Sequence, residues 1–436
     1  MRNTFPRGGI HPPDGKELTS AQATQKLPAP QLLYLPLGQH LGAPSQSIVE
    51  RGQQVLLGEK IAESGGKVGV PVHASVSGVV KDFTTTTMPN GTKSLTVVLE
   101  NDGKDTPAPP LRRPQREPEE IAPEEIVDFM EEAGLVGMGG AAFPTHVKYR
   151  LPEGTKIDTL IVNGAECEPF LTCDHRLMLE DTDDLILGIR LMMRASGATR
   201  AIVGIEENKP DAIALLEERF AGLPQVEVKK VKLKYPQGEE RLLIKAATGR
   251  EVAPDELPSK AGVIVNNVAT VAALGQAFRT GMPLIERVVT VTGPGVEKPG
   301  NWRVRLGTPV EELLGAAVWR GTTTLLAGGP MTAPAIFDLK TPVTKATSGL
   351  VALDEKTQQA GPCIRCGRCV QACPFGRMPL YFGPYLEQGR LDELEDMGLL
   401  HCRECGCCSY VCPAHRPILQ TIRLAKARIR NRTREV

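Results

Sequence analysis

Apolar and polar positions change their spacing several times along the chain, and each change marks a different expected structure. Residues 29–104 hold short runs in which the two kinds alternate, such as Ser94–Glu100, which is typical of half-buried strands. Between residues 124 and 280, short apolar runs are each followed by a stretch with helical spacing. Residues 286–335 return to strand patterns, and residues 350–425 predict short helices around cysteines. The sequence therefore predicts several modules of different architecture.

The central segment predicts an α/β domain. Its three short apolar runs are expected strands, at Thr159–Val162, Ala201–Ile205 and Gly262–Val265. The stretches with helical spacing that follow them are Asp184–Met193, Asp211–Phe220 and Val268–Phe278. Alternation of strands and helices is typical of a largely parallel sheet, which binds ligands at the carboxyl ends of its strands.

Composition narrows the function classes. The 436 residues include 51 basic and 51 acidic side chains and only 4% aromatics, so neither a basic field nor stacking surfaces favour nucleic acid as a partner. No run reaches the roughly 18 to 20 apolar residues of a membrane-spanning helix. The first residues lack the apolar core of a signal peptide, so we expect a reducing cytoplasm. Eleven cysteines there indicate metal ligands or redox groups before disulfides.

Eight of these cysteines form the motif C-x2-C-x2-C-x3-C-P twice. The first run is Cys363, Cys366, Cys369 and Cys373 with Pro374, and the later run is Cys402, Cys405, Cys408 and Cys412 with Pro413. In bacterial two-cluster ferredoxins the fourth cysteine of each such run ligates the other cluster. We therefore assign one [4Fe–4S] cluster to Cys363, Cys366, Cys369 and Cys412, and a second to Cys402, Cys405, Cys408 and Cys373. Zinc is the alternative, since C-x2-C pairs also bind zinc, but the repeated spacing and prolines favour clusters.

The other three cysteines, Cys167, Cys173 and Cys407, are expected to be buried like small apolar residues. Cys407 stands beside Cys408 but does not fit the spacing of the motif.

A glycine-rich loop is the second candidate site. Residues 137–142 satisfy G-x-G-x-x-A, but a helix is expected before the loop rather than a strand, which disfavours an ordinary dinucleotide fold. Such a loop still lets backbone amides approach a flat ring or a phosphate. Polar segments that follow strands or lie between them are Asn163–Pro169, Tyr235–Glu240 and Asn266–Thr270. Their asparagines suit the hydrogen-bonding edge of an isoalloxazine, and Lys148 suits a phosphate.

Together these segments resemble the FMN- and NADH-binding 51 kDa subunit of respiratory complex I. That family shows a G-x-G-G-x-G-F-P-x-G-x-K loop, which stands here as Gly137–Lys148, and matches to its N-A-D-E-x-E-P, Y-x-x-G-E-E and N-N-V-E-T segments. The resemblance implies non-covalent FMN, held by Gly137, Gly139, Gly140, Lys148, Asn163, Glu166, Asn266, Asn267 and Thr270. It also implies catalytic residues that face the nicotinamide nucleotide, namely Phe143, Glu168, Glu239 and Glu240. Other residues replace those of the family at Met138, Ala142, His146, Ala165 and Ala269.

A resemblance over nearly the whole chain is to the RnfC family, the C-subunit of the Rnf electron transport complex. It rests on Phe5–Pro13, Gln39–Pro44, Asn163–Pro169 and the two cysteine runs. It implies a multidomain α/β and α+β fold with an N-terminal β barrel-sandwich hybrid, a Rossmann-like flavin domain, a β-grasp domain and a helical two-cluster ferredoxin-like domain. The expected domains are an N-terminal extension (1–28), a lipoyl-like barrel-sandwich domain (29–104), a proline-rich linker (105–123), the FMN/NADH domain (124–280), a soluble-ligand-binding β-grasp domain (281–349), the ferredoxin-type domain (350–425) and a basic tail (426–436).

The function implied by this resemblance is electron input to an ion-translocating ferredoxin:NAD+ oxidoreductase. Electrons would pass between NAD(H), FMN and two [4Fe–4S] clusters, to or from the iron–sulfur B-subunit of a membrane complex. The chain would then lie peripherally on the cytoplasmic face of the bacterial inner (plasma) membrane. Two alternatives remain: a corrin reductase of bacterial microcompartments, disfavoured by the N-terminal place of the barrel-sandwich domain, and a non-catalytic wiring or docking subunit.

Overall fold

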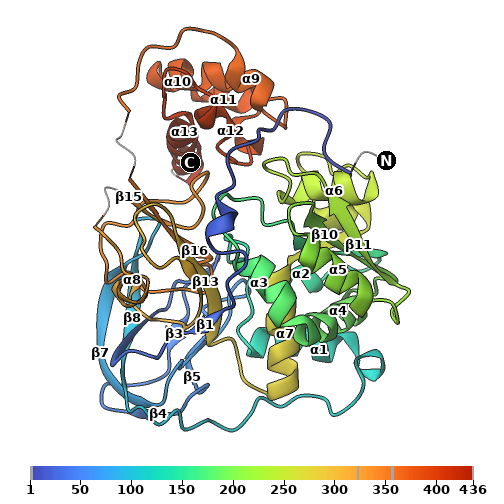
Figure 1. Cartoon of the computed structure of the whole chain (residues 1–436), viewed down its shortest axis with the longest axis vertical. Coiled ribbons are helices and arrows are strands. Elements are labelled where there is room, and N and C mark those ends of the chain that lie inside the picture. The colour runs from blue at the N-terminus through green and yellow to red at the C-terminus, as the bar shows by residue number, and fades with distance from the viewer. Residues whose placement is uncertain (1–2, 322–323, 355–357, 435–436) are drawn as a thin grey trace.

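The modules of the molecule meet around one junction. The computed structural model describes residues 3–321, 324–354 and 358–434, so residues 1–2, 322–323, 355–357 and 435–436 of the expected domains lie outside it. The cysteine-rich module lies at one end, with an α/β module and two β modules below it on opposite sides (Figure 1). One continuous apolar core joins the three lower modules, whereas the cysteine-rich module has a core of its own.

The N-terminal β module consists of two small sheets. A four-stranded sheet has the order β2-β8-β7-β4 and a three-stranded sheet the order β3-β5-β6. The strands are β2 (Leu32–Pro36), β3 (Gln46–Ser47), β4 (Gln54–Val55), β5 (Lys60–Glu63), β6 (Val72–His73), β7 (Gly78–Thr87) and β8 (Lys93–Asn101). The expected strand at Ser94–Glu100 is confirmed, since it lies within β8.

The α/β module has a parallel sheet in the order β11-β10-β9-β12. Its strands are β9 (Thr159–Gly164), β10 (Arg200–Glu206), β11 (Val226–Val231) and β12 (Val263–Asn267). Its helices are α1 (Pro123–Glu132), α2 (Thr145–Tyr149), α3 (Cys173–Glu180), α4 (Thr182–Ser196), α5 (Pro210–Arg219), α6 (Glu240–Thr248) and α7 (Val268–Thr280), with short 3-10 turns η2 (Pro118–Glu120) and η3 (Pro258–Ala261). The three expected strands are confirmed, as are the three helices that follow them.

Strand β11 was not predicted, because it is an edge strand in which three of the four middle residues are charged and all four are at least partly exposed. In the sheet, β10 and β11 lie on one side of β9, and β12 lies on its other side. The direction in which the strands are added therefore reverses between β9 and β12. A ligand site of such a sheet lies at this reversal, at the carboxyl ends of β9 and β12. Helix α7, which starts there, packs closely on α4: a Cβ on Gly188 would stand 1.9 Å from the carbonyl oxygen of Val271.

The β-grasp-like module has a mixed five-stranded sheet in the order β1-β14-β13-β16-β15. Its elements are β1 (Gln25–Lys26), β13 (Glu286–Thr292), β14 (Gly300–Arg305), β15 (Thr324–Ala327), β16 (Gly349–Leu353) and helix α8 (Val310–Ala316). Strand β16 lies mostly beyond the expected boundary at residue 349, yet it pairs with β13 in the register Val291–Leu350. The module therefore takes strands from both sides of the range expected for it.

The cysteine-rich module is helical. It contains α9 (Arg368–Ala372), α10 (Pro379–Glu387), α11 (Leu391–Asp396), η4 (Leu399–His401), α12 (Cys407–Tyr410) and α13 (Ile418–Arg434). The expected separate tail continues α13 instead, because Ala425 and Ile429 face the module core and Arg432 pairs with Glu395. Among the helices in the described ranges, none combines the length and apolar character needed to cross a membrane.

The N-terminal extension binds the modules together. It contains turn η1 at Lys16–Leu18 and ends in β1, which pairs with β14. Before that, the amide of Gly9 donates to the carbonyl of Ala372 in the cysteine-rich module (2.9 Å), and Ile10 forms a bridge with Tyr235 of the α/β module. The extension thus crosses the junction at which the other modules meet.

Candidate cofactor sites

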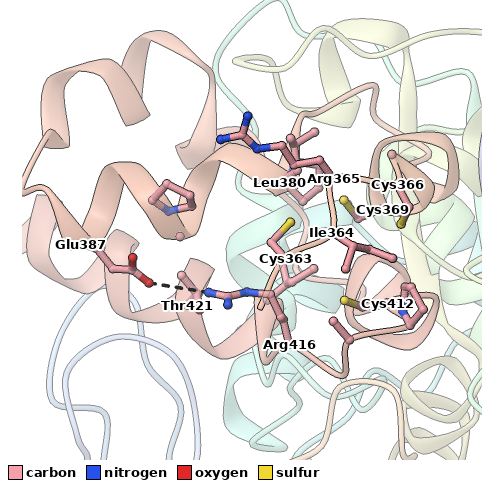
Figure 2. Close-up of a pocket in the computed structure, with 17 residues that line it drawn as sticks. Cys363, Ile364, Arg365, Cys366, Cys369, Leu380, Glu387, Cys412, Arg416 and Thr421 are labelled. Atoms are coloured by element: carbon pink, nitrogen blue, oxygen red, sulfur yellow. Dashed lines mark ion pairs between the residues drawn. The ribbon is translucent and has the colours of Figure 1, made fainter. Parts of the chain in front are cut away.

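The first cavity of the cysteine-rich module holds three cysteines of the first run and the last of the later run. Cys363, Cys366, Cys369 and Cys412 line a space of about 170 Å³ (Figure 2). All residues around it belong to the cysteine-rich module, from α9, α10, α13 and their loops. Cys363 and Cys366 are exposed, whereas Cys369 is buried. This cavity therefore opens toward solvent.

The second cavity holds the complementary set. Cys373, Cys402, Cys405 and Cys408 line it together with Cys407. Backbone amides point at two of the sulfurs: Arg377 N lies 3.3 Å from Cys373 Sγ, and Glu404 N lies 3.4 Å from Cys402 Sγ. The four expected ligands of each cavity are a donor set suited to an iron–sulfur cluster. The residues present therefore fit two clusters.

The two cysteine loops repeat the same backbone conformation. Arg365 and Glu404 occupy matching places with φ of 53° and 55°, and Gly367 and Gly406 with φ of 76° and 77°. The conformations agree although the side chains differ. The sequence repeat is thus a structural repeat, with α9 and α12 as its two short helices.

The second cavity lies against the α/β module. The hydroxyl of Tyr235, in the loop between β11 and α6, donates to the carbonyl oxygen of Cys405 at 2.8 Å. Arg403, between Cys402 and Cys405, donates to the carboxylate of Glu239 at 2.9 Å. Sequence reasoning pointed to the segment of Tyr235 but not to this role, which depends on contacts between distant parts of the chain.

Glu168 lies at the centre of the junction. Its carboxylate accepts hydrogen bonds from Met331 N (3.1 Å), Thr332 Oγ1 (2.6 Å) and Tyr235 OH (3.3 Å). Burial raises the pKa of Glu168, and these hydrogen bonds oppose the rise. Burial likewise raises the pKa of Glu239, whose side chain caps α6 through Arg241 N. Both carboxylates are therefore engaged at the boundary with the cysteine-rich module.

The glycine loop lies at the reversal of strand order. It is closed by hydrogen bonds from Gly137 N to Phe143 O (2.8 Å) and from Ala142 N to Gly137 O (3.1 Å). Met138 N donates to Thr270 Oγ1 at 2.9 Å, which anchors the loop to the first turn of α7. The residues at its tip, Gly139, Gly140 and Ala141, are exposed. Across the part of the chain that is described, no protein acceptor takes their amides.

Several expected flavin ligands gather at this edge. Lys148 donates to Val265 O at 2.9 Å and lies 3.4 Å from Glu240, while Phe143 is half-buried in the loop. Asn266 donates to Tyr149 OH (2.7 Å) and Asn163 to Gly238 O (2.8 Å). Unused amides, a half-exposed ammonium group and amide side chains are donors and acceptors suited to a flavin nucleotide, so these residues fit FMN.

The carboxylate of Glu166 forms its hydrogen bonds at the start of α3, where it accepts from the amides of Asp174 and His175. It lies 3.8 Å from Lys16 of the N-terminal extension. Burial and the nearby Glu166 raise the pKa of Asp174 to about 7, and Asn267 donates to its carboxylate at 2.7 Å. Sequence reasoning missed Lys16 and Asp174, because no local pattern indicates partners that are far apart in the chain.

Four family models match the chain, in the order in which its modules occur. They are an RnfC barrel-sandwich hybrid domain at residues 4–104, a Nuo51 FMN-binding domain at 130–276, an SLBB domain at 288–337 and a 4Fe-4S dicluster domain at 362–415. These matches confirm the expected multidomain fold class.

Similar proteins of known assignment match almost the whole chain. The C-subunit of the Na+-translocating ferredoxin:NAD+ oxidoreductase complex of Acetobacterium woodii is 39% identical, over 97% of this chain and 96% of its own. The C-subunit of the ion-translocating oxidoreductase complex of Rhodobacter capsulatus is 42% identical, over 98% and 83%. The C-subunit of the proton-translocating ferredoxin:NAD+ oxidoreductase complex of Clostridium ljungdahlii is 39% identical, over 97% and 93%.

Proposed function

The chain belongs to the RnfC family, the C-subunits of ion-translocating ferredoxin:NAD+ oxidoreductase (Rnf) complexes, and from this premise we propose that it is the electron-input subunit of such a complex. When bound, FMN exchanges electron pairs with NAD(H) and single electrons with iron–sulfur clusters, which pass them on one at a time. The residues of this chain would hold FMN and the two clusters one after another in space, so that electrons pass from one group to the next. The observation that carries the proposal is the contact of Tyr235 with Cys405, at 2.8 Å, between the α/β module and the second cavity.

The geometry supports an order for the two clusters. The second cavity, with Cys402, Cys405, Cys408 and Cys373, would hold the cluster on the flavin side, because Tyr235 of the α/β module and Gly9 of the N-terminal extension donate hydrogen bonds to residues at or beside it. The first cavity, with Cys363, Cys366, Cys369 and Cys412, would hold the cluster on the partner side, because two of its cysteines are exposed. If electrons flow in the opposite direction, toward NAD+, they would pass from the cluster on the partner side to the cluster on the flavin side.

FMN would lie over the glycine loop at the carboxyl ends of β9 and β12. The phosphate of FMN would be bound by the unpaired backbone amides of Gly139 and Gly140 and by the ammonium group of Lys148, because amides and a cation together stabilise a phosphate. Asn163 and Asn266 would orient the ring edge. Glu240 lies 3.4 Å from Lys148 and Phe143 belongs to the loop, so the nicotinamide nucleotide would approach the flavin past them.

The proposed partner is the iron–sulfur B-subunit of the same membrane complex, which would dock where Cys363 and Cys366 are exposed. The chain would attach peripherally on the cytoplasmic face of the membrane through its partners. In its basic C-terminal helix, Arg423, Lys426 and Arg432 pair with acidic residues of the same module, whereas Arg428 and Arg430 are exposed.

An anaerobic reconstitution tests the proposal. Purified chain loaded with iron, sulfide and FMN is expected to contain two full [4Fe–4S] clusters and one extractable flavin, and to bleach on addition of NADH. The variant Lys148→Met is expected to retain less FMN, since it loses a cation at the loop. Lys156→Met, which removes an exposed lysine before the amino end of β9, is the control and is expected to retain FMN like wild type.

Two outcomes would contradict the proposal. Full clusters with no retained flavin and no bleaching by NADH would favour the wiring or docking subunit. Fewer than two clusters in the wild-type chain would overturn the assignment of eight cysteine ligands.

A further inference from the structure

A buried carboxylate is hydrogen-bonded to one of the asparagines beside the glycine loop. Asp174, in the first turn of α3, is only 8% exposed. Its Oδ2 accepts a hydrogen bond from Nδ2 of Asn267 at 2.7 Å. Asn267 is the last residue of β12, whereas Asp174 lies in the segment that follows β9. The bond therefore joins the chain at the carboxyl ends of the two strands between which the strand order reverses.

The side-chain amide of Asn267 is held in one orientation. Its Oδ1 accepts from the backbone amide of Ala269 at 2.9 Å, as the cap of α7. An oxygen is needed to accept from Ala269 and a nitrogen to donate to Asp174, so these two partners determine which end of the amide faces which neighbour. The amide nitrogen carries two hydrogens, and among the described residues Asp174 is its one protein acceptor. One N–H of Asn267 thus remains available to a ligand.

The glycine loop packs directly against this side chain. A Cβ on Gly139 would lie 3.2 Å from the Cβ of Asn267 and 3.4 Å from its Nδ2. The next residue of α7 but two, Thr270, accepts from Met138 N at 2.9 Å, so the loop is fixed to the same end of the helix. The exposed loop amides and the remaining N–H of Asn267 are therefore neighbouring donors on one edge of the sheet.

We propose that Asp174 is a positioning residue of the flavin site, which orients the amide of Asn267 so that this N–H is donated to an acceptor of the isoalloxazine. The inference rests on the proposed FMN site and adds to it a residue that acts through Asn267 rather than by contact with FMN. A hydrogen bond to the ring stabilises the reduced form more than the oxidised form, because the reduced ring carries more electron density. Asp174 would thereby affect both the affinity for FMN and the midpoint potential of the bound flavin.

Titration of the cluster-loaded, flavin-extracted chain with FMN tests the inference, followed by a redox titration of the bound flavin. In Asp174→Ala the Kd for FMN is expected to rise about tenfold, because the amide of Asn267 loses the partner that orients it. Asp174→Asn removes the charge but keeps a side-chain oxygen that can accept from Asn267, so its Kd is expected to stay within about twofold of wild type. Both variants lack the charge, so the lower flavin potential expected in Asp174→Ala than in Asp174→Asn reports on the hydrogen bond alone.

A double-mutant cycle with Asn267→Ala separates positioning from packing. Because Asp174 acts through Asn267, Asp174→Ala is expected to change the Kd by less than about twofold when Asn267 is already alanine. The control is Asp184→Ala, which removes another buried carboxylate of the α/β module, paired with Arg279 at the far end of α7, and is expected to bind FMN like wild type.

Three outcomes would overturn the role of Asp174 alone. They are unchanged FMN binding in Asp174→Ala, an equal loss of affinity in Asp174→Asn and Asp174→Ala, and a full effect of Asp174→Ala in the Asn267→Ala background. An equal loss in Asp184→Ala would also overturn it, because the effect would then be a general loss of folding. A wild-type chain that binds no FMN would overturn the proposed function, and the inference with it.

Discussion

The two cysteine cavities share one backbone design but differ in what surrounds them. Residues of the cysteine-rich module line both cavities, and the first exposes Cys363 and Cys366. Beside the second, the α/β module and the N-terminal extension are in contact with the module, where Tyr235 donates to Cys405 O and Gly9 donates to Ala372 O. The two copies of the cysteine motif therefore lie in different environments. This difference supports electron transfer from the cluster of the second cavity to the cluster of the first cavity, beside the exposed cysteines.

The exchange of fourth cysteines between runs gives the largest expected effect. Cys373→Ala removes a first-run residue from the second cavity, so the cluster of the later run is expected to be lost while the other remains. Cys412→Ala is the reciprocal variant and is expected to remove the first-run cluster. Iron and sulfide counts with electron paramagnetic resonance check both, and retention of the later-run cluster in Cys373→Ala would rule out the crossed ligation.

The different solvent exposure of the two cavities gives the next largest expected effect, a difference in the rates at which the clusters are lost. Chelators and oxygen reach a cluster through solvent, so the cluster beside exposed Cys363 and Cys366 is expected to be lost several-fold faster than the one beside buried Cys408. Timed exposure of the holoprotein to a chelator, with each cluster followed spectroscopically, measures the two rates. Equal rates would show that the second cavity is not protected.

The hydrogen bond of Tyr235 is the contact that distinguishes the second cavity. Tyr235→Phe leaves the carbonyl oxygen of Cys405 and one oxygen of Glu168 without this donor, which is expected to lower the free energy of unfolding by about 1–3 kcal/mol. Denaturant unfolding of the holoprotein checks the value. Tyr410→Phe, at an exposed tyrosine of the same module, is the control and is expected to have almost no effect.

The smallest expected effect is a dependence of protein stability on pH that arises from Glu168. Burial raises the pKa of Glu168 above its usual value, so the folded state holds this proton more tightly than the unfolded state. The contribution of Glu168 to stability is then full below the unfolded pKa, near 4.5, and falls as pH rises through the folded pKa. Unfolding of wild type and Glu168→Gln at pH 4.5 to 7 tests this, and an increasing advantage of wild type with rising pH would contradict it.

Much of the fold was predictable because it depends on local patterns. Apolar runs such as Thr159–Val162 and Ala201–Ile205 identified central strands, whose burial on both faces requires continuous apolar sequence. Strand β11 was not predicted, because an edge strand needs no continuous apolar run. Strand β16 and the end of α13 were assigned to other parts, since pairing with β13 and packing on α11 are decided by distant residues.

The candidate sites divide in the same way. Cysteine spacing indicated all eight expected ligands, because three ligands of each cluster lie close together in sequence and the motif occurs twice. The environment of Glu168 and Cys407 was not predictable, since Tyr235, Met331 and Ile10 reach them from distant segments. Sequence therefore predicted which groups the chain would bind, and the structure indicates how the candidate sites are connected.

The central claim is that electrons from NADH reach the protected cluster before the exposed one. Rapid-freeze electron paramagnetic resonance after mixing with NADH tests it in two FMN-loaded variants, Cys373→Ala and Cys363→Ala. The claim predicts that the remaining cluster is reduced at nearly the wild-type rate in Cys363→Ala, and that in Cys373→Ala the flavin bleaches while the remaining cluster stays oxidised on the same timescale. Reduction of that cluster at the wild-type rate in Cys373→Ala would contradict the claim.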